Sequence, residues 1–167
     1  MVETGTKHVL ADGRSVTIRP VTPQDEPAER LFFRQLSPGT RRLRFHKWSN
    51  VVNDELVHFY THVDHDRHMA FVCEHDGRIV GDARYVAHPA TPSCELGIVV
   101  ADDWHHTGIA QLLMRALIDA ARAHGISTIE GLVLSDNTDM LDFVKSFGFE
   151  VLRVPEDVAT VRVVKWL

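Results

Sequence analysis

Cysteine is scarce in this 167-residue chain, which contains only Cys73 and Cys94. Two cysteines by themselves form neither a disulfide framework nor a zinc site. No stretch approaches the roughly 20 apolar residues that a membrane-spanning helix needs, and the amino terminus lacks the apolar run of a signal peptide. We therefore expect a soluble cytoplasmic protein that does not insert into membranes.

Linkers rich in Pro, Gly or Ser, internal repeats and low-complexity segments are also absent. The length is close to the roughly 150 residues of one hydrophobic core, so residues 1–167 are expected to form a single domain. The balance of 44% hydrophobic and 25% charged residues excludes a disordered or fibrous chain. A net charge of −5, from 18 basic and 23 acidic residues, argues against nucleic acid as a partner.

Hydrophobic periodicity and turn residues predict alternating strands and helices. Asp12-Gly13 and Asp76-Gly77 are typical of tight turns between strands, and Ser37-Pro38-Gly39 is expected to end the first helix. The predicted helices cover 22–36, 53–62, 108–124 and 138–147. The predicted strands cover 7–10, 15–19, 69–73, 79–88, 94–101, 128–134, 149–154 and 159–165. This order indicates a mixed α/β domain with a central sheet.

The most informative segment is the strand–turn–helix over residues 98–110. A buried strand leads into a polar turn, and the small residues Gly108 and Ala110 stand at the start of a long helix. Small residues leave the first amides of a helix unobstructed, and the helix dipole favours an anion there. The segment is suited to holding a diphosphate, although an ordinary turn with close packing has the same pattern.

The segment His105-His106-Thr107-Gly108-Ile109-Ala110 resembles motif A of the GNAT superfamily of N-acetyltransferases, Gln/Arg-x-x-Gly-x-Gly/Ala. It matches at Gly108 and Ala110 and departs at His105. Asn137, followed by a helix and Phe147-Gly148-Phe149, is similar to a second family feature. The resemblance implies a mixed, mostly antiparallel sheet flanked by helices. It further implies that the sheet splays between its fourth and fifth core strands.

Residues 31–45, 63–64 and 79–85 are similar to the catalytic domain of bacterial protein-lysine acetyltransferases. Some of these relatives carry a cyclic-nucleotide-binding domain or an acyl-CoA-synthetase-like region, for which this chain is too short. The resemblance implies acetyl-CoA as co-substrate and a protein lysine as acceptor. Acetylation of a small amine, and a non-catalytic domain that senses acyl-CoA, are the alternatives. The sequence does not indicate the oligomeric state.

Glu95 is the candidate general base. It lies in a predicted central strand, where an acidic residue is unexpected, and it points away from the face that carries residues 94, 96, 98 and 100. A lysine-like amine with a pKa near ~10.4 must lose a proton before it attacks a thioester. The resemblance to protein-lysine acetyltransferases implies that the acidic residue in this pattern is the general base; a solvated or salt-bridged glutamate is the alternative.

The resemblance assigns cofactor contacts mainly to the backbone. The strand around Ile98, Val99 and Val100 would pair with the pantetheine amides and offer an N–H to the thioester oxygen, and the amides from His106 to Ala110 would hold the diphosphate. Asn137 would bind pantetheine or order a water, and His105 and His106 would add hydrogen bonds to phosphate. The expected cofactor-binding residues are Ile98, Val99, Val100, His105, His106, Thr107, Gly108, Ile109, Ala110 and Asn137. The family's tyrosine general acid corresponds to Val144, which cannot donate a proton.

Two further residues, Asp64 and Tyr85, are expected to contact the acceptor. Asp64 belongs to a loop over 62–68 that contains three histidines and two aspartates. This composition is also typical of a solvated loop, and we expect no metal site. Six basic residues between 30 and 47 are expected to form a charge cluster paired with the acid-rich remainder of the chain.

Overall fold

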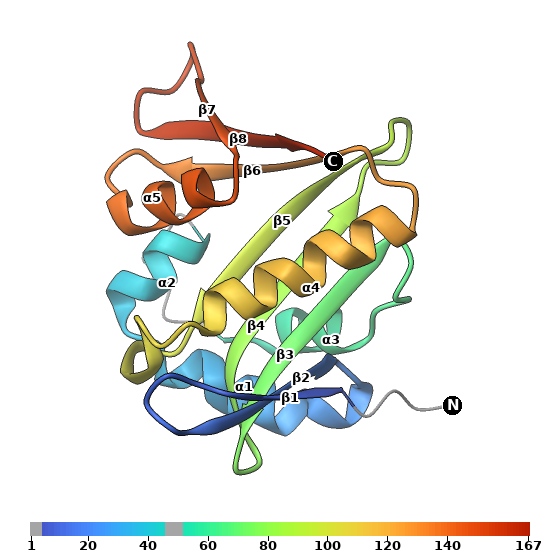
Figure 1. Cartoon of the computed structure of the whole chain (residues 1–167), viewed down its shortest axis with the longest axis vertical. Helices are drawn as coiled ribbons and strands as arrows, with labels where there is room; N and C mark the ends of the chain where they lie inside the picture. The colour runs from blue at the N-terminus through green and yellow to red at the C-terminus, as the bar shows by residue number, and fades with distance from the viewer. Residues whose placement is uncertain (1–4, 46–51) are drawn as a thin grey trace.

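A computed structural model describes residues 5–45 and 52–167. In this part of the chain eight strands form one sheet in the order β1-β2-β3-β4-β5-β6-β8-β7 (Figure 1). The strands are β1 (Thr6–Val9), β2 (Ser15–Pro20), β3 (His68–His75), β4 (Arg78–Ala87), β5 (Ser93–Val100), β6 (Thr128–Leu134), β7 (Glu150–Arg153) and β8 (Thr160–Trp166). The helices are η1 (Pro23–Asp25), α1 (Glu26–Gln35), α2 (Pro38–Phe45), α3 (Asp54–Thr61), η2 (Asp102–Trp104), α4 (Ile109–Ala123) and α5 (Thr138–Ser146).

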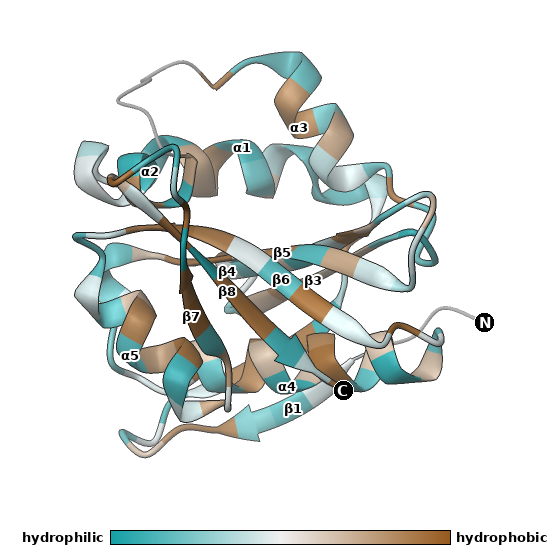
Figure 2. Ribbon diagram, turned by 90° about the horizontal axis from the view of Figure 1, so that it is seen from above, coloured by the Kyte–Doolittle hydropathy of each residue, from teal (hydrophilic) through white to brown (hydrophobic). Residues whose placement is uncertain are grey.

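The helices cover both faces of the sheet. Helices α1, α2 and α3 lie on one side, and α4 and α5 lie on the other (Figure 2). All neighbouring strands are antiparallel except β5 and β6, which run parallel. The parallel pair arises because α4 returns the chain to the same end of the sheet, as a strand–helix–strand crossover does. The predicted mixed, mostly antiparallel sheet flanked by helices is confirmed.

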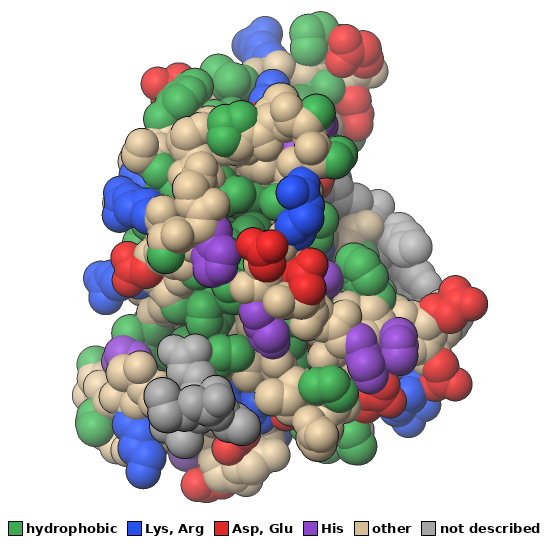
Figure 3. All heavy atoms as spheres, turned by 90° about the vertical axis from the view of Figure 1, so that its right-hand side faces the viewer, with side chains coloured by type: hydrophobic (Ala, Val, Ile, Leu, Met, Phe, Trp, Pro, Cys, Tyr) green, Lys and Arg blue, Asp and Glu red, His purple; other side chains and the backbone are tan. Residues whose placement is uncertain are grey.

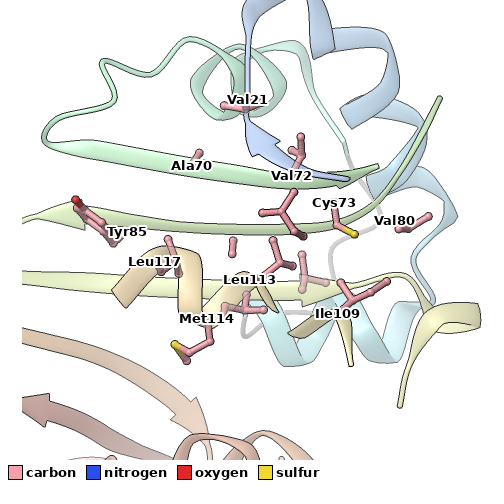
Figure 4. Close-up of a cluster of buried hydrophobic side chains, with 14 of the residues drawn as sticks. Val21, Ala70, Val72, Cys73, Val80, Tyr85, Ile109, Leu113, Met114 and Leu117 are labelled. Atoms are coloured by element: carbon pink, nitrogen blue, oxygen red, sulfur yellow. The ribbon is translucent and has the colours of Figure 1, made fainter. Parts of the chain in front are cut away.

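The main hydrophobic core lies between α4 and the centre of the sheet (Figure 4). Ile109, Leu113 and Leu117 recur at the spacing of one helix face, and each is at most 1% exposed. Gly81 on β4 permits this close packing, since a Cβ there would come within 3.0 Å of the Leu113 side chain. Truncation of such a buried leucine typically costs about 2–5 kcal/mol. The start of α4 is therefore held firmly against the sheet.

The sheet splays between β5 and β6, which are the fourth and fifth core strands once the edge strand β1 is set aside. These two strands pair only from Ser93–Glu95 to Thr128–Glu130, whereas β5 pairs with β4 along residues 94–100. The N–H of Ala101 donates to the Val80 carbonyl. Because backbone groups alternate between the two neighbouring strands, those of Leu96, Ile98 and Val100 point into the gap. Beyond the last residue pair with β6, the strand thus directs the backbone groups of Ile98 and the N–H of Val100 into the gap.

The first helix ends before residues 37–39, as predicted, but the helix α2 that begins there was not predicted from the sequence. Ser37 caps the new helix with its Oγ, which accepts the N–H of Thr40 at 3.1 Å. Pro38 then occupies the first helical position, where its missing N–H costs nothing. In the described parts of the chain, no helix combines the length and apolar character that crossing a membrane requires.

Candidate functional site

The turn between β5 and α4 presents the amino end of a helix without a side-chain cap. Gly108 is the N-cap residue with φ of +96°, and a Cβ on it would meet nothing within 4 Å. His106 also has a positive φ, of +61°. The first amides of a helix have no partner within the helix, and the dipole makes this end favourable for anions. The geometry suits the diphosphate group expected from the sequence.

Hydrogen bonds to the rest of the protein hold this turn in place. His105 Nε2 lies 2.9 Å from the carbonyl oxygen of Val100. Asp102 accepts hydrogen bonds from the Ser37 N–H at 2.7 Å and from the Thr40 hydroxyl. Burial opposes ionisation of Asp102, but these hydrogen bonds outweigh it and lower the pKa of its carboxyl. The turn is therefore fixed to the start of α2.

A cleft of about 660 Å³ runs from this turn into the gap between β5 and β6. Its walls come from β5, β6, α2, α5 and the first turn of α4, and its volume is typical of a small-molecule site. The structure brings the predicted base and every predicted cofactor-binding residue to this one cleft. They are Glu95, Ile98, Val99, Val100, His105, His106, Thr107, Gly108, Ile109, Ala110 and Asn137. Their roles remain predictions.

Glu95 lies where β5 leaves β6. It forms the last residue pair between the two strands, opposite Glu130, and its side chain is exposed at the cleft. Within residues 5–45 and 52–167, no side chain forms an ion pair with it. The exposed carboxylate is therefore available to a molecule in the cleft.

The two predicted acceptor contacts, Tyr85 and Asp64, are not among the residues that line the cleft. Tyr85 is 0% exposed, and burial raises its pKa to about 12. Asp64 accepts backbone hydrogen bonds from His68 and Asp66, both at 2.9 Å, and these lower its pKa. Asp64 thus organises its own loop, and Tyr85 packs in the core.

Asn137 and Val144 define the α5 wall of the cleft. Asn137 is the N-cap residue of α5, and its Oδ1 accepts the N–H of Met140 at 3.3 Å. Val144 is 0% exposed and apolar. No hydroxyl is available at this position to protonate a leaving group.

Helix α2 adds a residue that sequence reasoning did not assign to the site, Arg44. One of its NH₂ groups donates to the Tyr60 hydroxyl at 3.0 Å, and its buried Nε has no partner among the described residues. Gly97 of β5 lies directly beneath the guanidinium. The only signal in the sequence was the basic run over 30–47, which does not indicate which arginine turns inward.

A buried polar cluster lies behind Tyr60. Arg84 donates to Asp82 through Nε at 2.9 Å and to the Tyr60 carbonyl at 3.1 Å, and its guanidinium stacks 3.7 Å from the Tyr60 ring. Burial opposes ionisation of Asp82, but the charge of Arg84 outweighs it and lowers the Asp82 pKa. Burial and the Asp82 charge raise the pKa of Glu29 well above its usual value. Both carboxyl oxygens of Glu29 are buried without a hydrogen-bond partner among the described residues, an environment that favours the neutral acid.

Three other arginines of the basic run, Arg30, Arg41 and Arg42, contact groups within the chain. Arg30 contacts Asp54 at 2.7 Å, and Arg42 contacts Asp136 at 3.0 Å. Arg41 donates to the Phe33 carbonyl at 3.1 Å. Lys47, the last member of the run, lies outside the described residues.

A strand splayed from its neighbour beside an exposed helix amino end is the arrangement that the sequence resemblance to acyl-CoA-dependent N-acetyltransferases implies. The chain belongs to the acetyltransferase (GNAT) family, which it matches over residues 27–149. The protein is therefore an N-acetyltransferase, which uses acetyl-CoA as co-substrate and an amine as acceptor. These predictions are confirmed.

Two relatives show how far the similarity extends. An acetyltransferase of Pseudomonas aeruginosa is 36% identical over 152 residues, which cover 89% of this chain and 82% of the relative. Acetyltransferase Pat of Mycolicibacterium smegmatis is 30% identical over 148 residues, which cover 86% of this chain and 43% of the relative. The chain thus spans less than half of Pat.

The solved structures confirm the fold. The GNAT domain of Streptomyces lividans PAT has a TM-score of 0.90 at 23% identity, covering 98% of this chain and 97% of that one. A cAMP-binding acyltransferase from Mycobacterium smegmatis has a TM-score of 0.67 at 26% identity, covering 96% of this chain and 47% of that one.

Proposed function

We propose that this protein transfers the acetyl group of acetyl-CoA to a lysine side chain of another protein, with Glu95 as the general base. The observation that carries the proposal is the position of Glu95, exposed in the cleft where β5 separates from β6. The resemblance of residues 31–45, 63–64 and 79–85 to bacterial protein-lysine acetyltransferases supports this acceptor class.

Glu95 would supply the step that an amine acceptor requires. A lysine side chain is protonated near neutral pH, because its ordinary pKa is about 10.4. The Glu95 carboxylate would take that proton directly or through one water, which leaves the nitrogen free to form a bond to the acetyl carbon. Acetyl-CoA supplies the thioester, and the carbon–sulfur bond breaks as the amide forms.

The backbone of β5 and the α5 wall complete the proposed mechanism. The Ile98 N–H points into the gap and would stabilise the oxyanion that develops on the acetyl oxygen. Val144 cannot protonate the sulfur. The thiolate would leave without an acid and take its proton from solvent, which an ordinary thiol pKa of about 8.5 permits.

The charges at the cleft support a cationic acceptor. Among the described lining residues, Glu95, Asp139 and Asp142 carry carboxylates and Arg44 carries a guanidinium. The carboxylates favour approach of an ammonium group. Close to Gly97, the positive charge of Arg44 would disfavour the ammonium form and promote loss of its proton.

The test is Glu95→Gln in the full chain, with release of the CoA thiol measured on lysine-containing peptides. Acetyl-CoA affinity should be unchanged, and turnover should fall by about 10²–10⁴, the usual contribution of a general base. Glu130→Gln is the matched control, because Glu130 faces Glu95 across the strand pair and forms an ion pair with Arg162 at 2.6 Å. Unchanged turnover in Glu95→Gln would eliminate Glu95 as the base.

A parallel screen of peptides and small amines tests the acceptor. Acetylation of peptide lysines, with small amines turned over poorly, supports the proposal. The reverse preference identifies a small-molecule acetyltransferase. Saturable binding of acetyl-CoA without thiol release on any acceptor would identify a sensor and overturn the proposal.

A further inference from the structure

Three potential metal ligands meet on the surface, away from the cleft. Glu26 begins α1, while His58 lies in the last turn of α3 and His62 is the C-cap residue four positions later. The His62 backbone N–H donates to the His58 carbonyl at 2.9 Å, which places the two side chains next to each other. One ligand atom from each of the three residues lies within 4.8 Å of the other two. Only His62 belongs to the histidine-rich loop over 62–68, so this is a different cluster from the one visible in the sequence.

The distances within the cluster match those around a small tetrahedral ion. Glu26 Oε1 lies 3.5 Å from the Nδ1 atoms of both His58 and His62. An ion bound at about 2.0–2.1 Å places neighbouring ligand atoms about 3.3–3.4 Å apart. The two imidazole rings are stacked, with their centroids 3.8 Å apart and 16° between their planes. A small rotation of exposed side chains would direct both rings at one ion.

We propose that Glu26, His58 and His62 form a surface site for a divalent transition-metal ion, with Zn²⁺ as its representative. Two imidazoles and one carboxylate suit Zn²⁺, Ni²⁺ or Cu²⁺, whereas Mg²⁺ and Ca²⁺ prefer oxygen ligands. Three protein ligands leave a fourth position for water.

The surroundings are compatible with such an ion. On the face shown in Figure 3, histidines lie at the surface next to acidic side chains. His58 is exposed, and Glu26 and His62 are partly exposed, so an ion reaches them from solvent. His62 Nδ1 also lies 3.1 Å from the His58 carbonyl oxygen. Coordination through Nδ1, the nitrogen that lies 3.5 Å from Glu26 Oε1, would replace this contact and the 3.1 Å contact with the Thr61 hydroxyl.

An ion in this site would join two helices. α1 and α3 pack against each other beside β4, and α3 also carries Tyr60, which contacts Arg44 of the cleft at 3.0 Å. An ion that binds the folded state and not the unfolded chain stabilises the fold by mass action. The site would therefore strengthen the helical layer that supports the acceptor side of the cleft.

The experiment is titration of the tag-free full chain with Zn²⁺, followed by calorimetry and by thermal unfolding. We expect one tight equivalent, a rise in Tm with Zn²⁺, and no competition from excess Mg²⁺. His58→Ala and His62→Ala should each lower the affinity at least tenfold. His124→Ala is the control, because His124 is an exposed helical histidine with the same contact to a carbonyl four residues earlier, at 2.8 Å. The control should bind as the parent does.

Coordination is checked separately with Co²⁺, whose visible absorption reports a site with imidazole ligands and low coordination number. These bands should appear with the parent and vanish with the His58→Ala/His62→Ala double variant. Tight stoichiometric binding that survives in the double variant, or binding that is weak in all variants alike, would overturn the site. The result does not depend on which amine the enzyme acetylates.

Discussion

The guanidinium of Arg44 lies against Gly97 at the point where β5 has separated from β6. A Cβ atom built on Gly97 would fall 2.5 Å from Arg44 Cζ and 2.9 Å from Arg44 Nε. The arginine therefore occupies the space that any other residue's side chain would take. The contact joins α2 to β5 one residue away from the backbone of Ile98 and two residues away from Glu95.

Replacing Gly97 by alanine should displace Arg44 from the cleft. Because an approach below 3 Å forces a shift of several tenths of an ångström or more, α2 or the arginine must move. We expect turnover with a lysine peptide to fall at least tenfold, with a smaller change in acetyl-CoA affinity. Steady-state kinetics and thermal unfolding measure both effects.

Gly131→Ala is the matched control for this change. Gly131 lines the opposite wall of the cleft on β6, and a Cβ there would meet its nearest neighbour at an ordinary 3.5 Å. Its activity should stay close to that of the parent. Equal losses in the two variants would show that the cleft tolerates no added methyl group, and that Arg44 has no special role.

Local patterns in the sequence were sufficient to predict the strands and the turn before α4. The strand β5, the glycine at the start of α4 and the first residue of α5, Thr138, are each set by neighbouring residues, and all lie where expected. The start of α2 was missed because Pro38 is compatible both with stopping one helix and with beginning another. The hydrogen bond from the Thr40 N–H to the Ser37 hydroxyl, which the structure shows, identifies Pro38 as the start of a helix.

Contacts between distant segments could not be predicted in this way. The contact of Arg44 with Gly97 joins residues 53 positions apart, and nothing in the basic run distinguishes Arg44 from Arg42, which pairs with Asp136. The acceptor contact of Tyr85 is expected from a resemblance, and the structure places this residue, fully buried, on the central strand β4. Side-chain direction on a central strand with both faces covered is decided by packing.

The buried Glu29 should make stability depend on pH in the direction opposite to ordinary carboxylates. Its pKa is raised on folding, so the folded state holds a proton that the unfolded chain loses above about pH 4.5. The contribution of Glu29 is fully present below that pH and is lost as the pH rises towards its folded pKa, by up to about 1.4 kcal/mol per pH unit.

Glu29→Gln tests this sign. A glutamine has no proton to lose. Relative to the parent, its free energy of unfolding should rise with pH between 4.5 and 8 in urea denaturation. Glu150→Gln, at an exposed position on β7, should show no such trend. A Glu29→Gln variant that is less stable by a constant amount at every pH would show that Glu29 is ionised in the fold.

Asp102 should connect acetyl-CoA binding to the position of α2. Its carboxylate accepts hydrogen bonds from both Ser37 and Thr40. Asp102→Ala therefore removes the hydrogen bonds that join the turn to the start of α2. We expect a loss of about 1–3 kcal/mol in stability and a weaker affinity for acetyl-CoA in calorimetric titration. Asp103→Ala removes a more exposed carboxylate that reaches Arg78 only at 3.3 Å, and it should have little effect. If Asp102→Ala and Asp103→Ala lowered stability and acetyl-CoA affinity equally, the cause would be the loss of a negative charge and not the loss of the hydrogen bonds that join Asp102 to the start of α2.

Gly108 should be required at the start of α4 for its backbone conformation, which orients the amides expected to hold the diphosphate. With φ of +96° and open space around a Cβ, Gly108→Ala meets no clash and acts only through backbone strain, of about 1–2 kcal/mol.

Gly125 at the other end of α4 has φ of +74° and the same open surroundings, so Gly125→Ala is a control with comparable strain. Both variants should lose similar stability in thermal unfolding. Only Gly108→Ala should weaken acetyl-CoA binding, by about tenfold or more, because relief of its strain rotates the amides away from the ligand. Equal affinities in the two variants would place the diphosphate elsewhere.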